Sequence, residues 1–221
     1  MKGSIIIIFL LLMVLVFTTG VSRADYRPVF SGKFEAGDRL YTEVMEDLSE
    51  ERVDEYFFRS FWLKYRQQLD VYEYYYFRIE YEDREYIIDN PGNSSTLNLW
   101  GNYTYYLKEN IRNRWEGNIR DKKYVNDRDR AYRSLRLKYQ LDYEHSPRHD
   151  YSVYLQRQIY NYNNVDRDNT RDRISCTWNY EVNSRLNLDT TIRLDREQYE
   201  PLSGRSNKYG RRLSLGFDFE L

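Results

Sequence analysis

The chain has 221 residues, with 34 Lys and Arg against 35 Asp and Glu, and is 31% charged, 41% hydrophobic and 17% aromatic. It is too polar for a bundle of membrane helices, each of which needs about 20 consecutive apolar residues. Its 24 Tyr residues argue against disorder, since disordered chains are poor in aromatic residues, and its net charge of -1 argues against nucleic-acid binding.

The first 24 residues predict a secretory signal peptide. Lys2 supplies a positive charge, residues 5–17 are unbroken apolar sequence, and Ser22-Arg23-Ala24 has small residues at the two positions that signal peptidase reads. Cleavage after Ala24 would leave residues 25–221 as one exported domain. A retained membrane anchor is the alternative, but the apolar run is short for a span. Cys176, the single cysteine, offers no internal disulfide.

Ten runs with a period of two follow, and this alternation predicts β-strands. The first run is long, because its apolar residues Phe30, Phe34, Ala36, Leu40 and Val44 all fall on the same face of a strand. The second, residues 55–67, is ambiguous, since apolar residues occupy both of its faces. The third has Val71, Tyr75, Phe77, Ile79 and Tyr81 on its apolar face, with Glu73 as the exception. The others lie around residues 97–107, 111–119, 135–143, 153–159, 174–182, 186–194 and 213–221.

The connections alternate in length. Short turns are expected near residues 68–70, 109–110, 145–148 and 183–184, and longer loops near 46–54, 83–95, 121–130, 161–172 and 196–208. Ten strands joined in this way form a simple up-and-down meander, with the short turns on the same side as both termini. Pro91, Pro147 and Pro201 fall in connections, where proline is tolerated.

The strand lengths and faces favour a membrane protein. A transmembrane β-strand needs about 9 to 11 residues, with an apolar face toward lipid and a polar face toward the lumen. Because a free strand edge is unfavourable in lipid, we predict an all-β fold: an up-and-down antiparallel transmembrane β-barrel of about ten strands. Tyr81, Tyr143 and Tyr180 end apolar rows, as in interfacial aromatic girdles. The rival interpretation is an exported soluble all-β periplasmic protein, which would bury its apolar faces against each other.

Over residues 25–221 the chain resembles the outer-membrane β-barrel proteins of Gram-negative bacteria, in their small porin-like class. The resemblance implies residence in the outer membrane, with outer-membrane lipid and the barrel assembly machinery as partners. It also implies an assembly signal in the terminal strand, at Leu213, Leu215, Phe217, Phe219 and Leu221. Family members usually end in an aromatic residue, whereas this chain ends in leucine.

An enzyme is the less favoured interpretation. The omptin proteases, which this chain resembles in strand number, use paired Asp with His at the extracellular rim, and lipid A deacylases pair Ser with His. Here His145 and His149 flank a predicted short turn at the other end, and we interpret them as solvated turn residues. Cys176 falls on the predicted lipid face, and residues 127–130 and 166–168 are expected to be solvated loops. We therefore predict no catalytic residue, no metal site and no cofactor.

The remaining candidate site is a row of charges on the predicted lumen face. Its members are Arg78, Glu80, Arg112, Arg114, Glu116, Arg136, Asp142, Glu144, Glu181, Asp189, Arg193, Arg212 and Asp218. Charges of both signs facing one interior would pair with each other, because unpaired buried charges are costly. The row predicts either a packed interior, in a structural or docking barrel, or a narrow porin-like channel for small polar solutes.

Overall fold

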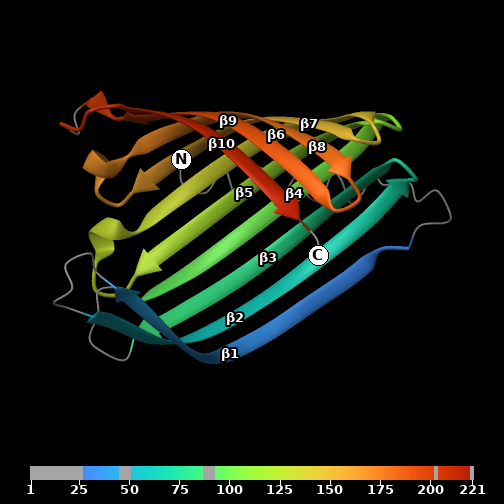
Figure 1. The fold of residues 1–221 in the computed structure, drawn as a ribbon. Coiled ribbons are helices and arrows are strands. Elements are labelled where there is room, and N and C mark those ends of the chain that lie inside the picture. Colours follow the sequence, from blue (N-terminus) through green and yellow to red (C-terminus); the bar gives the residue numbers. More distant parts are fainter. Residues whose placement is uncertain (1–26, 45–50, 87–92, 202–203, 220–221) are drawn as a thin grey trace.

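The computed structural model describes residues 27–44, 51–86, 93–201 and 204–219. They form one antiparallel sheet of ten strands in sequence order (Figure 1). The strands are β1 (Val29–Val44), β2 (Glu51–Asp70), β3 (Glu73–Tyr86), β4 (Ser94–Lys108), β5 (Ile111–Tyr124), β6 (Tyr132–Ser146), β7 (His149–Tyr162), β8 (Asn169–Asn183), β9 (Leu186–Tyr199) and β10 (Lys208–Phe219). The predicted all-β meander of ten strands is confirmed. The predicted signal peptide, residues 1–24, lies outside the described residues.

Two kinds of connection alternate along the meander. Two-residue turns join β2 to β3, β4 to β5, β6 to β7 and β8 to β9. At the other end of the sheet the connections are longer, and two of them contain the single-turn 3₁₀ helices Arg128–Arg130 and Val165–Arg167. We call these two ends the short-turn end and the long-loop end. No helix in the described ranges is long and apolar enough to cross a membrane.

One predicted turn is misplaced by the sequence reasoning. Val71 was expected to begin the third strand, but it belongs to the turn, because β2 continues to Asp70. Asp70 pairs with Glu73 after a register shift, and its carboxylate accepts a hydrogen bond from the backbone N–H of Val71 at 2.5 Å. The turn therefore occupies residues 71–72 instead of the expected 68–70, with this side-chain contact at its first residue.

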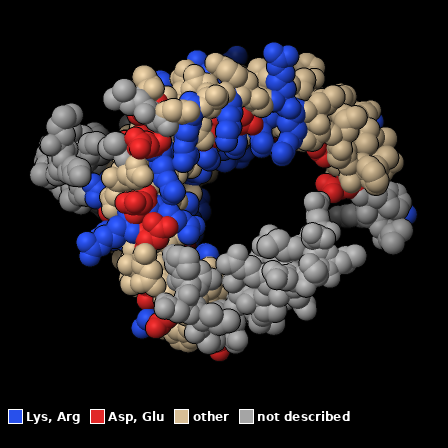
Figure 2. Space-filling view, turned by 90° about the vertical axis from the view of Figure 1, so that its left-hand side faces the viewer, with Lys and Arg blue, Asp and Glu red and all other residues tan. Residues whose placement is uncertain are grey.

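The sheet is curled but open. Each strand pairs with its sequence neighbours, and within the described residues β1 and β10 are its two unpaired edges. Figure 2, seen from the long-loop end, shows Lys, Arg, Asp and Glu side chains bordering a central hollow. The closed barrel that the sequence predicts is therefore absent from the described structure, and only its meander is present.

The sheet has a polar buried face and an apolar exposed face. We call the face that carries Asn98, Asn118, Ser134 and Ser175 the inward face, and the opposite one, with Leu137, the outward face. The four inward residues are at most 7% exposed, whereas Leu137 is 56% exposed. The largest exposures of strand leucines and phenylalanines, in Phe34, Leu215 and Phe217, also occur on the outward face. This distribution is the reverse of a water-soluble fold.

The register resolves the ambiguous second strand. Phe61 pairs with Tyr81, and Leu63 with Ile79, so these residues face outward. Trp62 pairs with Glu80 and therefore faces inward, beneath the guanidinium of Arg78. Apolar residues occur on both faces of β2 because an aromatic ring can pack against a cation in the polar interior.

Candidate functional site

The inward face carries the whole predicted row of charges. Cross-strand partners point to the same face of a sheet, and the register joins, for example, Arg112 to Asp142 and Glu116 to Lys138. The same register places on the inward face all of Arg78, Glu80, Arg112, Arg114, Glu116, Arg136, Asp142, Glu144, Glu181, Asp189, Arg193, Arg212 and Asp218. The structure brings them together on one wall of the hollow.

Part of this row is paired. Asp142 accepts hydrogen bonds from Arg112 Nε at 2.9 Å and from Gln140 Nε2 at 2.8 Å. Arg78 lies 3.1 Å from Glu80, and Arg193 lies 2.8 Å from Asp195. These contacts neutralise opposite charges along and between neighbouring strands, as a polar interior requires.

Aromatic rings form a second layer of inward contacts that the sequence reasoning missed. Arg78 lies 4.9 Å from the Trp62 ring centre, and Arg136 lies 4.7 Å from that of Trp100. Lys138 packs in the same way on Tyr154. Such cation–π contacts stabilise cations without adding negative charge. The alternation in the sequence places Trp100 on the polar face of its strand, but nothing in it indicates that these rings would lie against cations.

Acidic side chains gather at the short-turn end of the inward face. Glu144 pairs directly with Asp150, and Asp189 pairs with Asn179, itself the partner of Asp150. Two polar cavities, of about 280 and 290 Å³, are lined there by Asp150 together with Glu144 in one and Asp189 in the other. Glu181 and Asp218 also line the second. We call Glu144, Asp150, Glu181, Asp189 and Asp218 the acidic rim.

The acidic rim lies next to a row of cations. Arg193 and Arg212 are cross-strand partners, and the register continues from them to Arg114. Within the described residues, no ion pair joins the acidic rim to these arginines. On these strands the acidic rim lies nearer the short-turn end than this row of arginines, although Arg112 and Arg148 also line the two cavities.

Charged residues lie on the outward face near the long-loop end, at the same distance from the strand end in several strands. In five strands, an outward charged residue lies three positions from the strand end at the long loops: Asp83 in β3, Asp121 in β5, Asp172 in β8, Arg196 in β9 and Arg211 in β10. Two positions farther from the loops each strand has an apolar or aromatic residue: Tyr81, Ile119, Ile174, Leu194 or Leu213. We call this line of charges, with Arg59, Arg133 and Arg157, the charged border.

Ion pairs connect neighbouring members of the charged border. Arg59 lies 3.0 Å from Asp83, and Arg133 lies 2.9 Å from Asp121. Asp172 contacts Arg157 at 3.4 Å and Arg196 at 2.7 Å. The border therefore runs across strands, parallel to the edge of the sheet that the long loops define.

Aromatic rings lie near the short-turn end of the outward face. Tyr143 stacks on Tyr151, and the His149 ring stacks 4.6 Å from Tyr180 and 6.0 Å from Trp178. Trp178 Nε1 also donates a hydrogen bond to His149 Nδ1 at 3.2 Å. Tyr143 and Tyr180 thus lie in one aromatic cluster, while Tyr81 lies at the opposite end beside the charged border.

The two histidines lie in strands beside the turn rather than in it, and His145 is exposed, as expected of a solvated residue. His145 is in β6 and His149 in β7, one on each side of the turn, and both rings join the outward aromatic cluster. The turn is shorter than expected, so the strands extend to include them. Among the described residues, no three His, Cys, Asp or Glu side chains form a group able to hold a metal ion.

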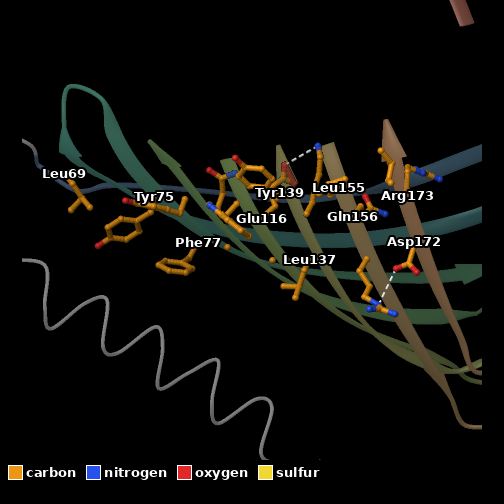
Figure 3. A pocket seen from close by; sticks show the side chains of 18 residues that line it. Leu69, Tyr75, Phe77, Glu116, Leu137, Tyr139, Leu155, Gln156, Asp172 and Arg173 are labelled. Atoms are coloured by element: carbon orange, nitrogen blue, oxygen red, sulfur yellow. Dashed lines mark ion pairs between the residues drawn. The ribbon is translucent and has the colours of Figure 1, made fainter. Parts of the chain in front are cut away.

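Between the aromatic cluster and the charged border the outward face is apolar and partly hollowed. Gly101 and Gly117 pair directly, and a cavity of about 850 Å³ opens there beside Phe77 and Leu137. By the register, Phe77 and Leu137 share the outward face with the Arg157–Asp172 pair, and the Glu116–Lys138 pair is on the inward face; Figure 3 shows Phe77, Leu137, Glu116 and Asp172 around the cavity. Glu73, the exception noted in the sequence, faces outward and accepts a hydrogen bond from the Tyr103 hydroxyl.

The residues predicted to form an assembly signal lie at the edge of the sheet. Leu213, Leu215 and Phe217 face outward in β10 and are 66–76% exposed. Phe219 ends the strand, and Leu221 lies outside the described residues. Cys176, on β8, is exposed on the outward face, where the sequence reasoning expected lipid.

No protein-family model and no curated protein matches the chain.

Proposed function

We propose that this protein is a bacterial outer-membrane β-barrel, closed by pairing of β1 with β10, that forms a narrow channel for small polar solutes. The observation that carries the proposal is the exposed apolar outward face. Monomeric soluble proteins rarely expose contiguous apolar patches larger than a few hundred Å², and outer-membrane barrels turn such a band toward lipid. Tyr143, Tyr151 and Trp178 would lie at one membrane interface and the charged border at the other.

The inward face supports a channel within that barrel. Charges of both signs border the hollow in Figure 2. Within the described residues, no ion pair joins the acidic rim to the row of arginines beside it, so both sets of charges face the hollow without neutralising each other.

The neighbours Cys176 and Thr177 provide the test. Cys176 faces outward and Thr177 inward, on the same strand. In lipid vesicles, a small charged, membrane-impermeant thiol reagent should leave Cys176 unmodified. It should modify a Thr177→Cys variant made with Cys176→Ser. Both cysteines should react once the protein is unfolded.

Each alternative gives a different result. Rapid modification of Cys176 in vesicles would contradict insertion, and release of the protein from membranes by carbonate would do the same. An unreactive cysteine at 177, with no conductance steps in a planar bilayer, would exclude a channel and leave a structural or docking barrel. A mobility difference between unboiled and boiled samples should report the folded barrel.

A further inference from the structure

The charged border is not balanced around the sheet. Arg59, on β2, lies within ion-pair distance of two carboxylates, Asp83 at 3.0 Å and Glu85 at 3.4 Å. On β7 to β10, by contrast, Arg157, Arg196 and Arg211 all face outward with Asp172 as the carboxylate among them. We call these four residues the arginine patch, and its formal charge is about +2, one carboxylate against three guanidinium groups.

The geometry of the arginine patch leaves guanidinium groups accessible. Asp172 contacts Arg157 and Arg196, and the side chains of these arginines are still 61% and 45% exposed. Arg211 is exposed, and no ion pair ties it to a carboxylate within the described strands. The nearby carboxylate of Asp195 has inward parity and is engaged by Arg173 and Arg193.

An apolar surface adjoins the patch. A cavity of about 440 Å³ is lined by Asp172, Arg196 and Arg211 together with Ile174 and Leu194. Asp195, Tyr209 and Gly210 complete its lining. Ile174 and Leu194 are 50% and 47% exposed and continue into the outward apolar band. The site therefore has cations toward the long loops and hydrocarbon toward the middle of the strands.

We propose that the arginine patch binds the phosphate headgroup of a membrane lipid in the leaflet on the long-loop side. The guanidinium fork matches phosphate oxygens and forms charge-assisted hydrogen bonds, and basic pockets next to apolar surface recognise anionic headgroups. The acyl chains of the same lipid would lie along Ile174 and Leu194. This inference rests on the proposed membrane insertion and adds a ligand to the outer wall.

The test compares two lipids with the same acyl chains, phosphatidic acid and phosphatidylcholine, as probes of the full mature protein folded in detergent. Lipid retention is measured by native mass spectrometry. The wild type should prefer phosphatidic acid by at least about tenfold, the scale of one charge-assisted hydrogen bond. The double variant Arg196→Gln/Arg211→Gln should lose that preference, and the matched outward variant Arg59→Gln should keep it.

Gel mobility and conductance of the same samples separate this inference from the proposed function. A protein that is folded and conducting but has no phosphatidic acid preference would overturn the lipid site alone. The site would also be overturned if Arg59→Gln lost as much preference as the double variant. Arg211→Gln alone breaks no ion pair of the described strands, so a folded single variant with weakened retention would support the site even if the double variant misfolds.

Discussion

Replacing Ile192 by arginine separates a lipid-facing wall from a water-facing one. Ile192 lies at the middle of β9, faces outward between Cys176 and Leu213, and is 54% exposed. In water, an exposed Ile→Arg substitution would change the free energy of unfolding by no more than about 0.5 kcal/mol. In a bilayer, arginine at mid-depth on the lipid face should cost about 2–4 kcal/mol.

The control is Tyr209→Arg, at the long-loop end of the same outward face. Tyr209 is 73% exposed and pairs with Arg196 of the charged border, so an arginine there should cost only about 0–1 kcal/mol. Both free energies are measured by urea unfolding of the protein in lipid vesicles, followed by tryptophan fluorescence. Equal, small effects at the two positions would refute the argument that the middle of β9 faces lipid.

Three further predictions concern closure, selectivity and interior pairing. With Cys176→Ser, a cysteine at Phe34 should form a disulfide in the folded protein with a cysteine at Leu215 or Phe217. It should form no disulfide with a cysteine at Ser214, which faces inward. Absence of a disulfide from Phe34 to both Leu215 and Phe217 would contradict β1–β10 closure. Asp150→Asn with Asp189→Asn should shift the reversal potential of the channel in a salt gradient toward anion selectivity, because both carboxylates line the acidic rim; an unchanged potential would exclude that rim from the conducting path. Asp142→Asn should lower the free energy of unfolding by about 1–2 kcal/mol, whereas Glu85→Gln, which removes the exposed outward contact with Arg59, should cost at most about 0.5 kcal/mol, and similar losses would argue against a stabilising interior pair.

The meander and its faces were predictable because alternation is a local signal. Leu213, Leu215 and Phe217 face outward regardless of what β10 packs against, since successive residues of a strand point to opposite sides. The same logic put the row from Arg78 to Asp218 on one face.

Other features depend on contacts that hydropathy does not encode. Trp62 faces inward and lies against the Arg78 guanidinium, and the Asp70 carboxylate accepts a hydrogen bond from the first residue of the turn after β2. Charged residues near the long loops were visible in the sequence. They could be recognised as a border of the outward face only once the structure showed where each strand ends. The proposed pairing between β1 and β10 has no local signal, because residues nearly the whole chain apart would have to meet.

Among the described residues, only three hydrophobic side chains are buried: Tyr75, Ile119 and Ala131, each with at most 6% of its surface exposed. A wall one sheet thick has no second layer to pack against, so the hydrophobic effect cannot act inside the protein as it does in a globular core. If the outward face lies in lipid, that contribution comes from the boundary between protein and bilayer. The stability of this protein is then a joint property of the protein and the bilayer. Its melting temperature should change with the acyl-chain length of the surrounding lipid even though no residue has changed.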